Sequence, residues 1–440
     1  MKTLICIPCL LTGGTEIQTL NTVRALVQGG HEVTVACYFE HTPYMIGQFE
    51  EAGAKVILFS PDGNRQGGWR IIPFLFRKLR SVVKAVRPDV VHVQYMAPGA
   101  MVILLLWLMR VKNIITTVHT AADIYKDLRL IHFIQRHCVR AWICITERAE
   151  HSFFGSSQLY SKDMVLEKRN HFTIYNALPF RQQVNCDDSL VNALCAVNVA
   201  LPRLKAAEQQ VNSDESQVKS CVAAVKGDGL KDPQSQGDDS PATPLRFTSN
   251  SVAIHRSDAA PVLGLVSRLE HIKGMDLVVP AFAEVRKRFP DVQLLVVGDG
   301  SLRAAMEQQA MALGCDDAVI WAGRQPQEEL SQYYSRMDIV LMPSRSEGFG
   351  LTAIEAMAHG CVVVASDIGG LPEVVRDGVC GLLHRSEDVR DMAEKICSLI
   401  ASSELYRSLQ KNALQHVQKF SFQRYAELIH NLYGKALKRG

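Results

Sequence analysis

The residues best suited to chemistry are two glutamates, Glu347 and Glu355, which flank a glycine-rich segment. The apolar run Ile339–Met342 before them predicts a buried strand, and the pattern after it predicts a helix beginning near Leu351. Glu355 then lies about one turn into that helix, where its carboxylate can accept hydrogen bonds from a diol. The alternative is an ordinary surface helix with acidic residues in its first turn. The apolar residues around Glu355 favour burial, and acidic side chains are seldom buried without a partner.

The segment between the two glutamates combines glycines with a predicted helix start, which is typical of an anion-binding turn. Glycine lets the backbone come close to a ligand, and the first N–H groups of a helix carry partial positive charge. We therefore expect backbone amides of this turn to face a bound ligand. The residues concerned are Gly348, Phe349, Gly350 and Leu351.

Arg268 and Lys273 are candidate cations, because both follow the apolar run Val262–Val266. Ligands of open parallel sheets bind at the carboxyl ends of strands, so this loop is well placed to neutralise a diphosphate. For a lone arginine and lysine, a solvated surface loop is the more ordinary interpretation. The pair gains weight only from the segments that accompany it.

Two further glycine pairs follow predicted strands. Gly13 and Gly14 stand between the opening run Thr3–Ile7 and a helical segment, and they indicate either an anion site at the helix start or a plain tight turn. They lack the full G-x-G-x-x-G spacing of a dinucleotide site. Gly298 and Gly300 form a similar strand-to-helix turn, which by itself indicates a structural role.

The histidines and cysteines give weaker signals. His119 follows the apolar run Ile114–Val118, and a single histidine at a strand end is more often a hydrogen-bonded structural residue than a catalytic one. His92 lies within a predicted strand, where we expect a core role. His92, His132, His137 and His151 are scattered without metal-ligand spacing, and no metal site is predicted. Cys6 and Cys9 have the spacing of a redox pair, but Cys6 lies in a predicted strand and a redox role is disfavoured.

Short apolar runs alternate with amphipathic segments along the chain, which is typical of parallel βαβ units. The first series of predicted strands is Thr3–Ile7, Glu32–Ala36, Lys55–Phe59, Val90–Val93, Ile114–Val118, Ala141–Ile145 and Thr173–Tyr175. The second series is Val262–Val266, Val292–Val297, Ala318–Trp321, Ile339–Met342, Val362–Ala365 and Gly381–His384. The predicted fold class is therefore α/β, with two Rossmann-like, doubly wound parallel sheets.

The pattern divides the chain into two domains and an insertion. The predicted ranges are 1–180 for the first domain, 181–256 for a flexible polar insertion and 257–419 for the second domain. Residues 212–240 contain no aromatic side chain, so this part cannot bury enough surface to offset the entropy of ordering its backbone. Residues 189–205 keep enough apolar side chains to predict a short helix. Helical spacing returns in 420–437, which predicts a docked terminal helix.

The composition is that of a soluble, folded protein. Of the 440 residues 47% are hydrophobic and 21% are charged, which excludes disorder throughout. The amino terminus has no signal-peptide pattern, and the longest apolar run, Met101–Met109, is too short to span a bilayer. We therefore expect a cytoplasmic protein whose twelve cysteines are reduced.

Positive charge is concentrated in the first part of the chain, where residues 1–180 hold 20 Lys and Arg against 13 Asp and Glu. Within it, 65–87 surrounds an apolar face with arginines and lysines. A peripheral contact with an anionic membrane and a helix packed on its own sheet explain this pattern equally well. A nucleic-acid partner is not expected, because no aromatic-and-basic platform is visible.

The run from Glu347 to Glu355, within Glu-Gly-Phe-Gly-Leu and Glu-Ala-Met-Ala-x-Gly surroundings, resembles the signature of glycosyltransferase family 4, also called glycosyl transferases group 1. Further family blocks are matched in order and spacing by Gly13-Gly14-Thr15-Glu16, Ser267-Arg268-Leu269 with Lys273-Gly274, Gly298-Asp299-Gly300 and Gly369-Gly370-Leu371-Pro372-Glu373. The resemblance covers both predicted domains and omits the insertion. It implies the GT-B fold, in which two Rossmann-like domains face a central cleft and the terminal helix, here 420–437, returns to the first domain.

The resemblance implies a retaining transferase that moves a sugar from a nucleotide diphosphate, with a uridine nucleotide favoured. Glu355 would hold the ribose hydroxyls and Glu347 would meet the transferred sugar. Arg268 and Lys273 would clamp the diphosphate in place of a metal ion, and Gly14 would approach it from the first domain. No cofactor is expected. The acceptor would be a hydroxyl of a glycan or lipid-linked molecule in surface polysaccharide or glycolipid biosynthesis.

The resemblance also assigns His119 to the family histidine near the reacting sugar. The implied catalytic residues are His119, Glu347, Arg268 and Lys273. The implied donor-binding residues are Gly13, Gly14, Arg268, Lys273, Gly298, Gly300, Glu347, Gly348, Phe349, Gly350, Leu351 and Glu355. One departure is Asn176-Ala177, where relatives commonly have Asn-Gly at the crossing between domains. A nucleotide-sugar epimerase on the same fold and a non-catalytic scaffold whose insertion binds a partner are the alternative functions.

Overall fold

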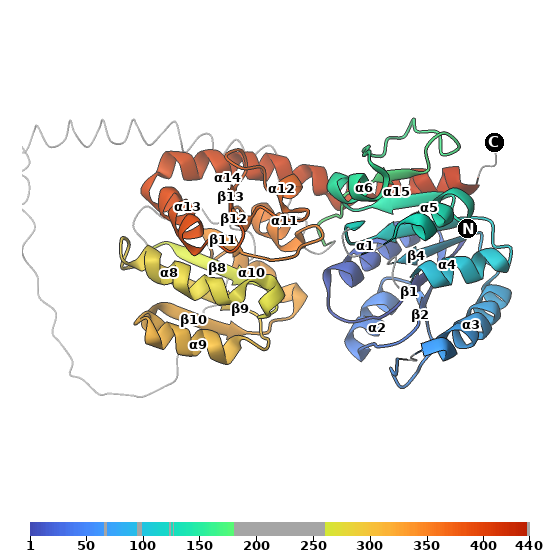
Figure 1. Ribbon diagram of the computed structural model, residues 1–440, viewed down its shortest axis with the longest axis horizontal. Coiled ribbons are helices and arrows are strands. Elements are labelled where there is room, and N and C mark those ends of the chain that lie inside the picture. Colours follow the sequence, from blue (N-terminus) through green and yellow to red (C-terminus); the bar gives the residue numbers. More distant parts are fainter. Residues whose placement is uncertain (66–67, 95–98, 123–124, 126, 180–259, 438–440) are drawn as a thin grey trace, which may run out of the picture. The chain divides into compact units, whose positions relative to one another are not determined.

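The computed structural model describes residues 1–65, 68–94, 99–122, 125, 127–179 and 260–437, which form two parallel sheets joined by helices (Figure 1). Both sheets belong to one compact unit of the chain. The predicted fold class, two Rossmann-like parallel-sheet domains, is confirmed. The predicted insertion 181–256, with its helix at 189–205, lies outside the described residues.

The first sheet has seven parallel strands in the order β3-β2-β1-β4-β5-β6-β7. Its strands are β1 (Lys2–Ile7), β2 (Glu32–Cys37), β3 (Lys55–Leu58), β4 (Val90–Gln94), β5 (Ile114–Val118), β6 (Ala141–Cys144) and β7 (His171–Thr173). The order reverses between β1 and β4. Ligands of such sheets bind beyond the carboxyl ends of the strands at this reversal.

The second sheet has six parallel strands in the order β10-β9-β8-β11-β12-β13. Its strands are β8 (Val262–Val266), β9 (Gln293–Val297), β10 (Val319–Gly323), β11 (Ile339–Met342), β12 (Val362–Ser366) and β13 (Leu382–His384). Its reversal lies between β8 and β11. The loop with Arg268 follows β8 and the loop with Glu347 follows β11, so both leave the sheet at its switch point.

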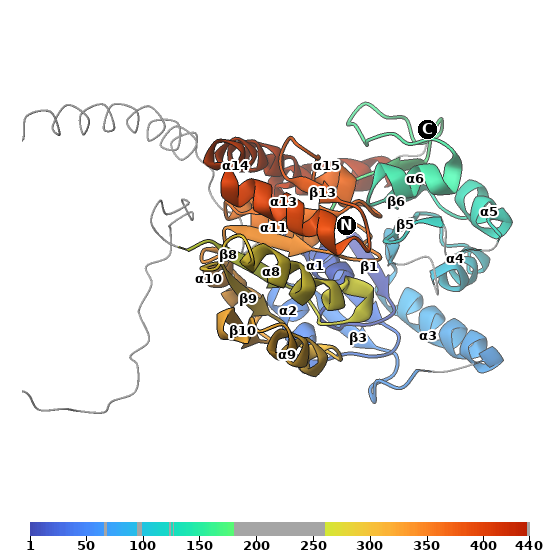
Figure 2. The ribbon, with the colours of Figure 1, turned by 60° about the vertical axis from the view of Figure 1, so that its left-hand side comes forward.

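Helices connect the strands and cover the sheets (Figure 2). Those around the first sheet are α1 (Gly14–Gln28), α2 (Pro43–Glu51), α3 (Ile71–Val86), α4 (Gly99–Leu108), α5 (Arg129–His137) and α6 (Glu147–Phe154). Those within residues 260–437 are α8 (Val278–Arg286), α9 (Arg303–Ala312), α10 (Leu330–Tyr334), α11 (Leu351–Ala358), α12 (Leu371–Val374), α13 (Val389–Ala401), α14 (Ser403–Val417) and α15 (Phe422–Leu437). None of these described helices has the length and apolarity that crossing a membrane requires.

The strands are apolar on both faces because each sheet is buried on both sides. In β9, Leu294 and Val296 pack into one core cluster, whereas Leu295 and Val297 pack into the cluster on the opposite face. Such burial contributes about 1.5–3 kcal/mol for each large aliphatic side chain. The first sheet is covered on its two faces in the same way. This explains why short unbroken apolar runs located the strands.

The last helix, α15, packs against the first sheet and α1 rather than against the second sheet that precedes it in the chain. Ile429 and Leu432 are buried in the same core cluster as β1 and β2. The Tyr425 hydroxyl shares a hydrogen bond of 2.8 Å with the hydroxyl of Thr22 in α1. The chain therefore returns from the second sheet to complete the core of the first.

The chain leaves the first sheet through Asn176 and Ala177, which are held by α1. The Gln18 side chain accepts a hydrogen bond from the Ala177 N–H at 3.0 Å, and the Asn21 amide donates to the Ala177 carbonyl at 3.2 Å. Among the described non-glycine residues, a positive φ occurs only at Arg87, Arg110 and Glu387. Asn176-Ala177 therefore needs no left-handed turn, because side chains of α1 fix the crossing instead.

One predicted strand is displaced by two residues. The sequence predicted Thr173–Tyr175, but the strand is β7, His171–Thr173. The aromatic ring of Tyr175 made the later segment look like a strand, whereas its hydroxyl donates to the Glu147 carboxylate at 3.1 Å. Its ring also contacts Phe349 and Phe420, so Tyr175 belongs to a contact between the two sheets rather than to a ladder.

Candidate functional site

Lys273 and Glu347 meet at the switch point of the second sheet. The Lys273 ammonium lies 2.6 Å from the Glu347 carboxylate, and the side chains are 21% and 17% exposed. Lys273 ends a short 3-10 helix, His271–Lys273, and Gly274 after it has a φ of 68°. A Cβ atom on Gly274 would lie 1.9 Å from the Pro343 carbonyl oxygen. Glycine is therefore required for the two loops to lie close enough to pair their charges.

Glu355 is buried in α11 and is hydrogen bonded through both oxygens. The Tyr334 hydroxyl donates to it at 2.9 Å, and the Gln327 side-chain amide donates at 3.2 Å. Burial raises the pKa of Glu355 to about 7, and these two hydrogen bonds oppose the rise. Glu355 is therefore a carboxyl group whose charge is sensitive near neutral pH.

The turn before Glu355 is shaped by Gly350, which precedes the first residue of α11 with a φ of 101°. A Cβ atom there would also lie 2.8 Å from a methyl carbon of Leu371. Backbone of this kind is accessible only to glycine without strain. Phe349 is buried, and its ring contacts Tyr175 and Phe420, so its side chain fills the core while its backbone belongs to the turn.

The glycine pair at the start of α1 lies against the start of α11. A Cβ atom on Gly14 would be 3.3 Å from a methyl carbon of Leu351. Glu16, in the first turn of α1, folds back so that one carboxylate oxygen lies 2.6 Å from a Cβ position on Gly13. Burial raises the pKa of Glu16, while a hydrogen bond from Cys9 and the charge of Arg268 lower it less strongly. The charge of Arg268 therefore acts on the helix start that carries Gly14.

His119 is buried beside the turn that carries Gly348. A Cβ atom on Gly348 would lie 2.5 Å from the His119 carbonyl oxygen. A ring nitrogen of His119 shares a hydrogen bond of 2.9 Å with the Gln94 side chain. Burial lowers the pKa of His119 to about 3, so the imidazole is neutral at physiological pH.

His92 stands behind His119 in the core of the first sheet, as its position in a strand predicted. Its two ring nitrogens form 2.7 Å hydrogen bonds with the hydroxyls of Tyr433 and Thr117. Gln94 lies 3.4 Å from the same ring. A chain of hydrogen bonds thus extends from α15 through His92 and Gln94 to His119.

Gly298 and Gly300 serve the packing of the loop that carries Arg268. Cβ atoms on them would lie 1.8 Å from the Ser267 carbonyl oxygen and 2.5 Å from the Leu269 carbonyl oxygen. The Leu269 N–H also donates to the Asp299 carbonyl at 3.0 Å. These glycines therefore support the candidate site from beneath the loop, and their structure gives them a reason independent of any ligand.

The predicted residues thus form a connected set. Lys273 is paired with Glu347, the adjacent Gly348 contacts the His119 backbone, and Leu351 lies next to Gly14. Arg268 is exposed on the loop after β8. Glu355 faces Tyr334 and Gln327 instead of the Lys273–Glu347 pair.

The sequence pattern gives no signal for several residues that contact the candidate site residues. Tyr334 and Gln327 hydrogen bond to Glu355 from segments that have no motif of their own, and Gln94 ends a strand without a polar pattern. Arg345, a cation within the glutamate motif, is held by Asp276 through two contacts of 2.6 and 2.8 Å. It also pairs with Glu387, so it anchors the loop.

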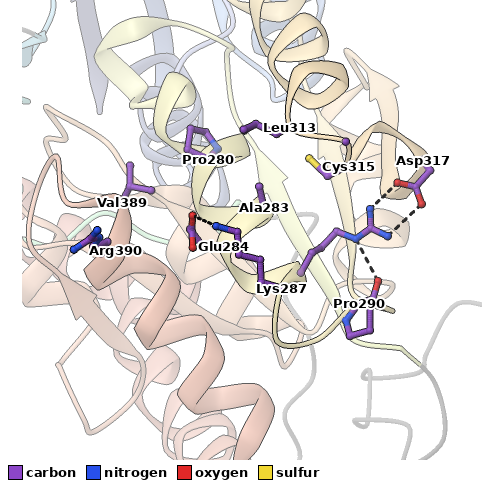
Figure 3. A pocket seen from close by; sticks show the side chains of 12 residues that line it. Pro280, Ala283, Glu284, Lys287, Pro290, Leu313, Cys315, Asp317, Val389 and Arg390 are labelled. Atoms are coloured by element: carbon purple, nitrogen blue, oxygen red, sulfur yellow. Dashed lines mark hydrogen bonds and ion pairs between the residues drawn. The ribbon is translucent and has the colours of Figure 1, made fainter.

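A cavity of about 730 Å³ lies elsewhere on the second sheet's helices (Figure 3). Its lining comes mainly from α8 and the segment after α9, with Val389 and Arg390 from α13. Arg286 on its wall forms an ion pair with Asp317 at 2.6 Å. None of its lining residues belongs to the loops that carry Lys273 or Glu347, so this cavity is separate from the candidate site.

The described residues contain no cluster of three or more His, Cys, Asp or Glu that could hold a metal ion. Cys6 and Cys9 are free thiols, and burial raises the pKa of both, that of Cys6 to about 12. A raised pKa keeps a thiol protonated and unreactive.

Comparison with known families assigns both halves of the chain. Residues 249–416 match the model described as glycosyl transferases group 1, and residues 12–154 match the model described as glycosyltransferase family 4. The chain belongs to glycosyltransferase family 4. The two matches contain every predicted site residue of this family 4 protein, from Gly13 to Glu355.

Curated relatives of this family 4 protein include D-inositol 3-phosphate glycosyltransferases. That of Segniliparus rotundus is 38% identical over 183 residues, which is 41% of this chain and 41% of the relative. That of Nocardia farcinica is 37% identical over 184 residues, which is 40% of this chain and 41% of the relative. The alignments therefore span about two fifths of the length of the curated relatives.

Solved structures resemble this family 4 protein over nearly its whole length. Anabaena HepE in complex with UDP has a TM-score of 0.66 at 17% identity, covering 99% of this chain and 100% of its own. A glycosyltransferase of Rickettsia africae has a TM-score of 0.69 at 16% identity, covering 100% and 99%. At such low identity the likeness shows the shared fold.

Proposed function

We propose that the protein is a retaining glycosyltransferase that moves a sugar from a nucleotide diphosphate, a UDP-sugar, to a hydroxyl group. The observation that carries the proposal is the Lys273–Glu347 pair at the switch point of the second sheet, beside a turn that touches the His119 backbone. A cation, a carboxylate and the backbone of a buried histidine thus meet where open α/β sheets bind ligands.

The cations have an electrostatic role in this proposal. Arg268 and Lys273 neutralise the diphosphate, and negative charge grows on its departing oxygen as the glycosidic bond breaks. Lys273 is held by Glu347 at 2.6 Å, so the same carboxylate fixes the ammonium while it binds a ring hydroxyl of the sugar. The backbone near Gly14 adds N–H groups at the start of α1.

Glu355 binds the two ribose hydroxyls of the nucleotide. As a carboxylate it has lone pairs left for a diol after accepting hydrogen bonds from Tyr334 and Gln327. The ionised carboxylate can accept hydrogen bonds from both ribose hydroxyls. The protonated carboxyl group has fewer acceptor positions left for them. Donor binding therefore depends on the charge of Glu355.

The neutral imidazole of His119 acts as a hydrogen-bonding group beside the sugar. Its pKa of about 3 excludes it as a base that gains a stable proton at neutral pH. The leaving phosphate takes the proton of the acceptor hydroxyl, which attacks from the face that the phosphate vacates. Retention of the anomeric configuration follows, and the reaction is expected to need no metal ion or cofactor.

The relatives support a UDP-sugar and a hydroxyl acceptor. Solved structures of Anabaena HepE hold UDP, UDP with glucose, and UDP-glucose. The curated relatives are named for an inositol phosphate acceptor. For this chain we propose a glycan or lipid-linked acceptor of surface polysaccharide or glycolipid synthesis.

We also propose that the protein is cytoplasmic and attaches peripherally to an anionic membrane through 65–87 and the two helices beside it. α3 packs Leu75, Leu79 and Val82 into the core, so the packed-helix interpretation holds for that face. Its other side exposes Ile72 and Phe76 to solvent, and Trp69 in the 3-10 turn Gly68–Arg70 before the helix is exposed as well. This outer face is free to meet lipid while the inner face holds the helix on its sheet.

The outer face continues over α4, which contacts α3, and over α5, which contacts α4 (Figures 1 and 2). We call the exposed side of α3, α4 and α5, together with Trp69 just before α3, the three-helix face. Exposed Trp107 of α4 meets exposed Phe133 of α5 edge to face, with ring centres 6.1 Å apart. The three helices hold six Lys and Arg and no Asp or Glu. Of these cations, Arg129 is paired with Asp127 just before α5 at 3.0 Å. Exposed aromatics among the remaining cations match an anionic lipid surface.

Donor binding and transfer test the function separately. Thermal unfolding is measured with a panel of nucleotide sugars, because a ligand at a hundred times its Kd stabilises by about 2.7 kcal/mol. We expect a UDP-sugar to raise the midpoint of thermal unfolding more than sugars linked to other nucleotides do. Chromatography then follows sugar transfer to a panel of hydroxyl acceptors. Conversion of the donor to an isomeric sugar without acceptor would identify an epimerase, and binding of no nucleotide sugar would refute the proposal.

A further inference from the structure

Glu373, on α12 beside the second sheet, binds the start of a helix of the first sheet. Its two carboxylate oxygens accept hydrogen bonds from the Glu147 N–H at 2.8 Å and the Arg148 N–H at 2.7 Å. The Thr146 side chain accepts from the Ala149 N–H at 3.2 Å. The first three free N–H groups of α6 are thus satisfied, two of them by one carboxylate more than 200 positions away.

The residues just before Glu373 hold the turn that contains Glu347. The Gly370 N–H donates to the Glu347 carbonyl at 3.0 Å. A Cβ atom on Gly369 would lie 1.9 Å from that same oxygen, and one on Gly370 would lie 2.4 Å from the Gly348 carbonyl oxygen. Because neither position has room for a Cβ atom, Gly369 and Gly370 allow the α12 segment to lie against the backbone of Glu347 and Gly348.

The same segment also touches the first sheet. A Cβ atom on Gly370 would lie 2.7 Å from the methyl carbon of Thr146, the residue that caps α6. The Arg148 side chain donates to the Gly369 carbonyl at 3.4 Å. A continuous set of contacts thus joins the start of α6, Glu373 and the turn of Glu347.

The surroundings of Glu373 make it costly to keep a carboxylate there. Burial raises the pKa of Glu373, and the nearby Glu147 carboxylate raises it further, against the hydrogen bonds from the Arg148 and Glu147 amides and Tyr175. Hydrogen bonds from a helix start to a carboxylate are charge assisted, which makes them stronger and more directional than neutral ones. This geometry favours a carboxylate that fixes a precise position.

We propose that Glu373 is a positioning residue that holds the Glu347 turn against α6 and thereby sets Glu347 and Gly348 beside His119. The inference rests on the proposed function, because it assigns Glu373 to the geometry of sugar transfer. Glu373 itself touches no reacting atom in this scheme. Donor binding through Glu355 is independent of it, because Glu355 is held by Tyr334 and Gln327 within the second sheet.

The test compares Glu373→Ala, Glu373→Gln and a matched control, Tyr44→Phe. The control removes the 3.0 Å hydrogen bond from Tyr44 to Glu328, which also joins α2 of the first sheet to the chain of the second but lies away from the Glu347 turn. For Glu373→Ala we expect kcat to fall about a hundredfold, the loss typical of a misplaced catalytic group, with the Kd for UDP unchanged. Glu373→Gln keeps one acceptor oxygen, so we expect its kcat to be about tenfold higher than that of Glu373→Ala. Tyr44→Phe should keep the wild-type kcat.

The readouts separate the two proposals. If the wild-type protein neither binds a nucleotide sugar nor transfers a sugar, the proposed function fails, whatever the variants do. If the wild-type protein is active and both Glu373 variants keep its kcat, only the positioning role is overturned. A Glu373→Gln variant that folds but loses UDP binding together with kcat also overturns it, because Glu373 would then serve the donor site. Should the alanine variant not fold, the glutamine variant decides alone, with a lower kcat at unchanged Kd as the supporting result.

Discussion

Glu355 is a residue whose charge depends on the fold around it. Burial raises its pKa from 4.5 to about 7, although Tyr334 and Gln327 both donate to it. Between these two values the folded protein binds a proton that the unfolded chain has released. Stability from this group is therefore complete below the unfolded pKa and is lost as the pH rises through the folded pKa.

The free energy of unfolding should fall as the pH rises from 4.5 to about 7, because of Glu355. The effect is on the order of 3 kcal/mol in total. Urea unfolding at a series of pH values measures it in the wild-type protein and in Glu355→Gln, which does not titrate. The variant should lack this part of the decline. Parallel curves for the two proteins would show that Glu355 keeps an ordinary pKa.

If Glu355 holds the ribose as proposed, the affinity for UDP-glucose should change in the opposite direction and increase as the pH rises through about 7, because the ionised carboxylate accepts more hydrogen bonds from the diol. The diphosphate of UDP-glucose does not titrate in this range, so calorimetry reports the protein group. Glu355→Ala should weaken binding about tenfold to a hundredfold, as expected for lost hydrogen bonds to a charged group. Unchanged affinity in this variant would remove Glu355 from the donor site.

Lys273 is expected to act on turnover more than on donor affinity. Lys273→Ala should lower kcat about a hundredfold to a thousandfold, the effect of removing one group that stabilises developing charge. Lys287→Ala is the matched control, because Lys287 also pairs with a glutamate at 2.6 Å but lies on the separate cavity. Steady-state kinetics of both variants make the comparison. Equal losses would indicate a general effect of removing a lysine.

At the scale of elements, the strands could be predicted and the contacts between elements could not. Ile114–Val118, Val262–Val266 and Ile339–Met342 were predicted with the bounds observed, because strands buried on both faces are unbroken apolar runs. The predicted segment Thr173–Tyr175 was wrong by two residues because an aromatic ring packs equally well in a strand or between domains. Local pattern carries no information on which surface a side chain meets.

The same limit applies to the site. The two glutamates, the cations and the glycines could be found from their spacing, since each lies in a loop that leaves a strand or in the first turns of the helix that follows it. Tyr334 and Gln94 could not, because their importance comes only from the groups that folding brings to them, Glu355 and His119. The Lys273–Glu347 pair also required the structure, since 74 positions separate its members.

Glycine positions at the strand ends offer a test of loop packing. Gly298→Ala should destabilise the protein by more than about 3 kcal/mol, because its Cβ would lie 1.8 Å from a backbone oxygen of Ser267 and its φ is 141°. Gly314→Ala is the control, since φ there is 63° but the Cβ meets open space. This variant should lose only about 1 kcal/mol. Urea unfolding measures both, and similar losses would contradict the packing role of Gly298.

At the scale of the whole molecule, the three-helix face should determine membrane attachment. We expect the full chain to float with vesicles that contain anionic lipid, to stay with the soluble fraction beside neutral vesicles, and to be released by high salt. Combined replacement of Trp69, Trp107 and Phe133 by Ala should abolish flotation. These are exposed side chains, so the thermal midpoint should change little.

Met311→Ala is the control for this experiment, because Met311 is 66% exposed on a helix of the second sheet. It should float like the wild-type protein. Equal binding to neutral vesicles would contradict an electrostatic attachment. Retention of binding after the three aromatic replacements would assign attachment to another surface.

The return of α15 to the first sheet has a consequence for how the chain is assembled. Tyr433 supplies a hydrogen bond to His92, and Ile429 and Leu432 fill the core around β1 and β2. The core around β1 and β2, whose strands are synthesised first, is therefore incomplete until α15, several hundred residues later in the chain, packs against it. A fragment that stops before Phe422 would expose the apolar surface that α15 covers. We expect this fragment to become soluble only when a separate peptide spanning 422–437 is supplied.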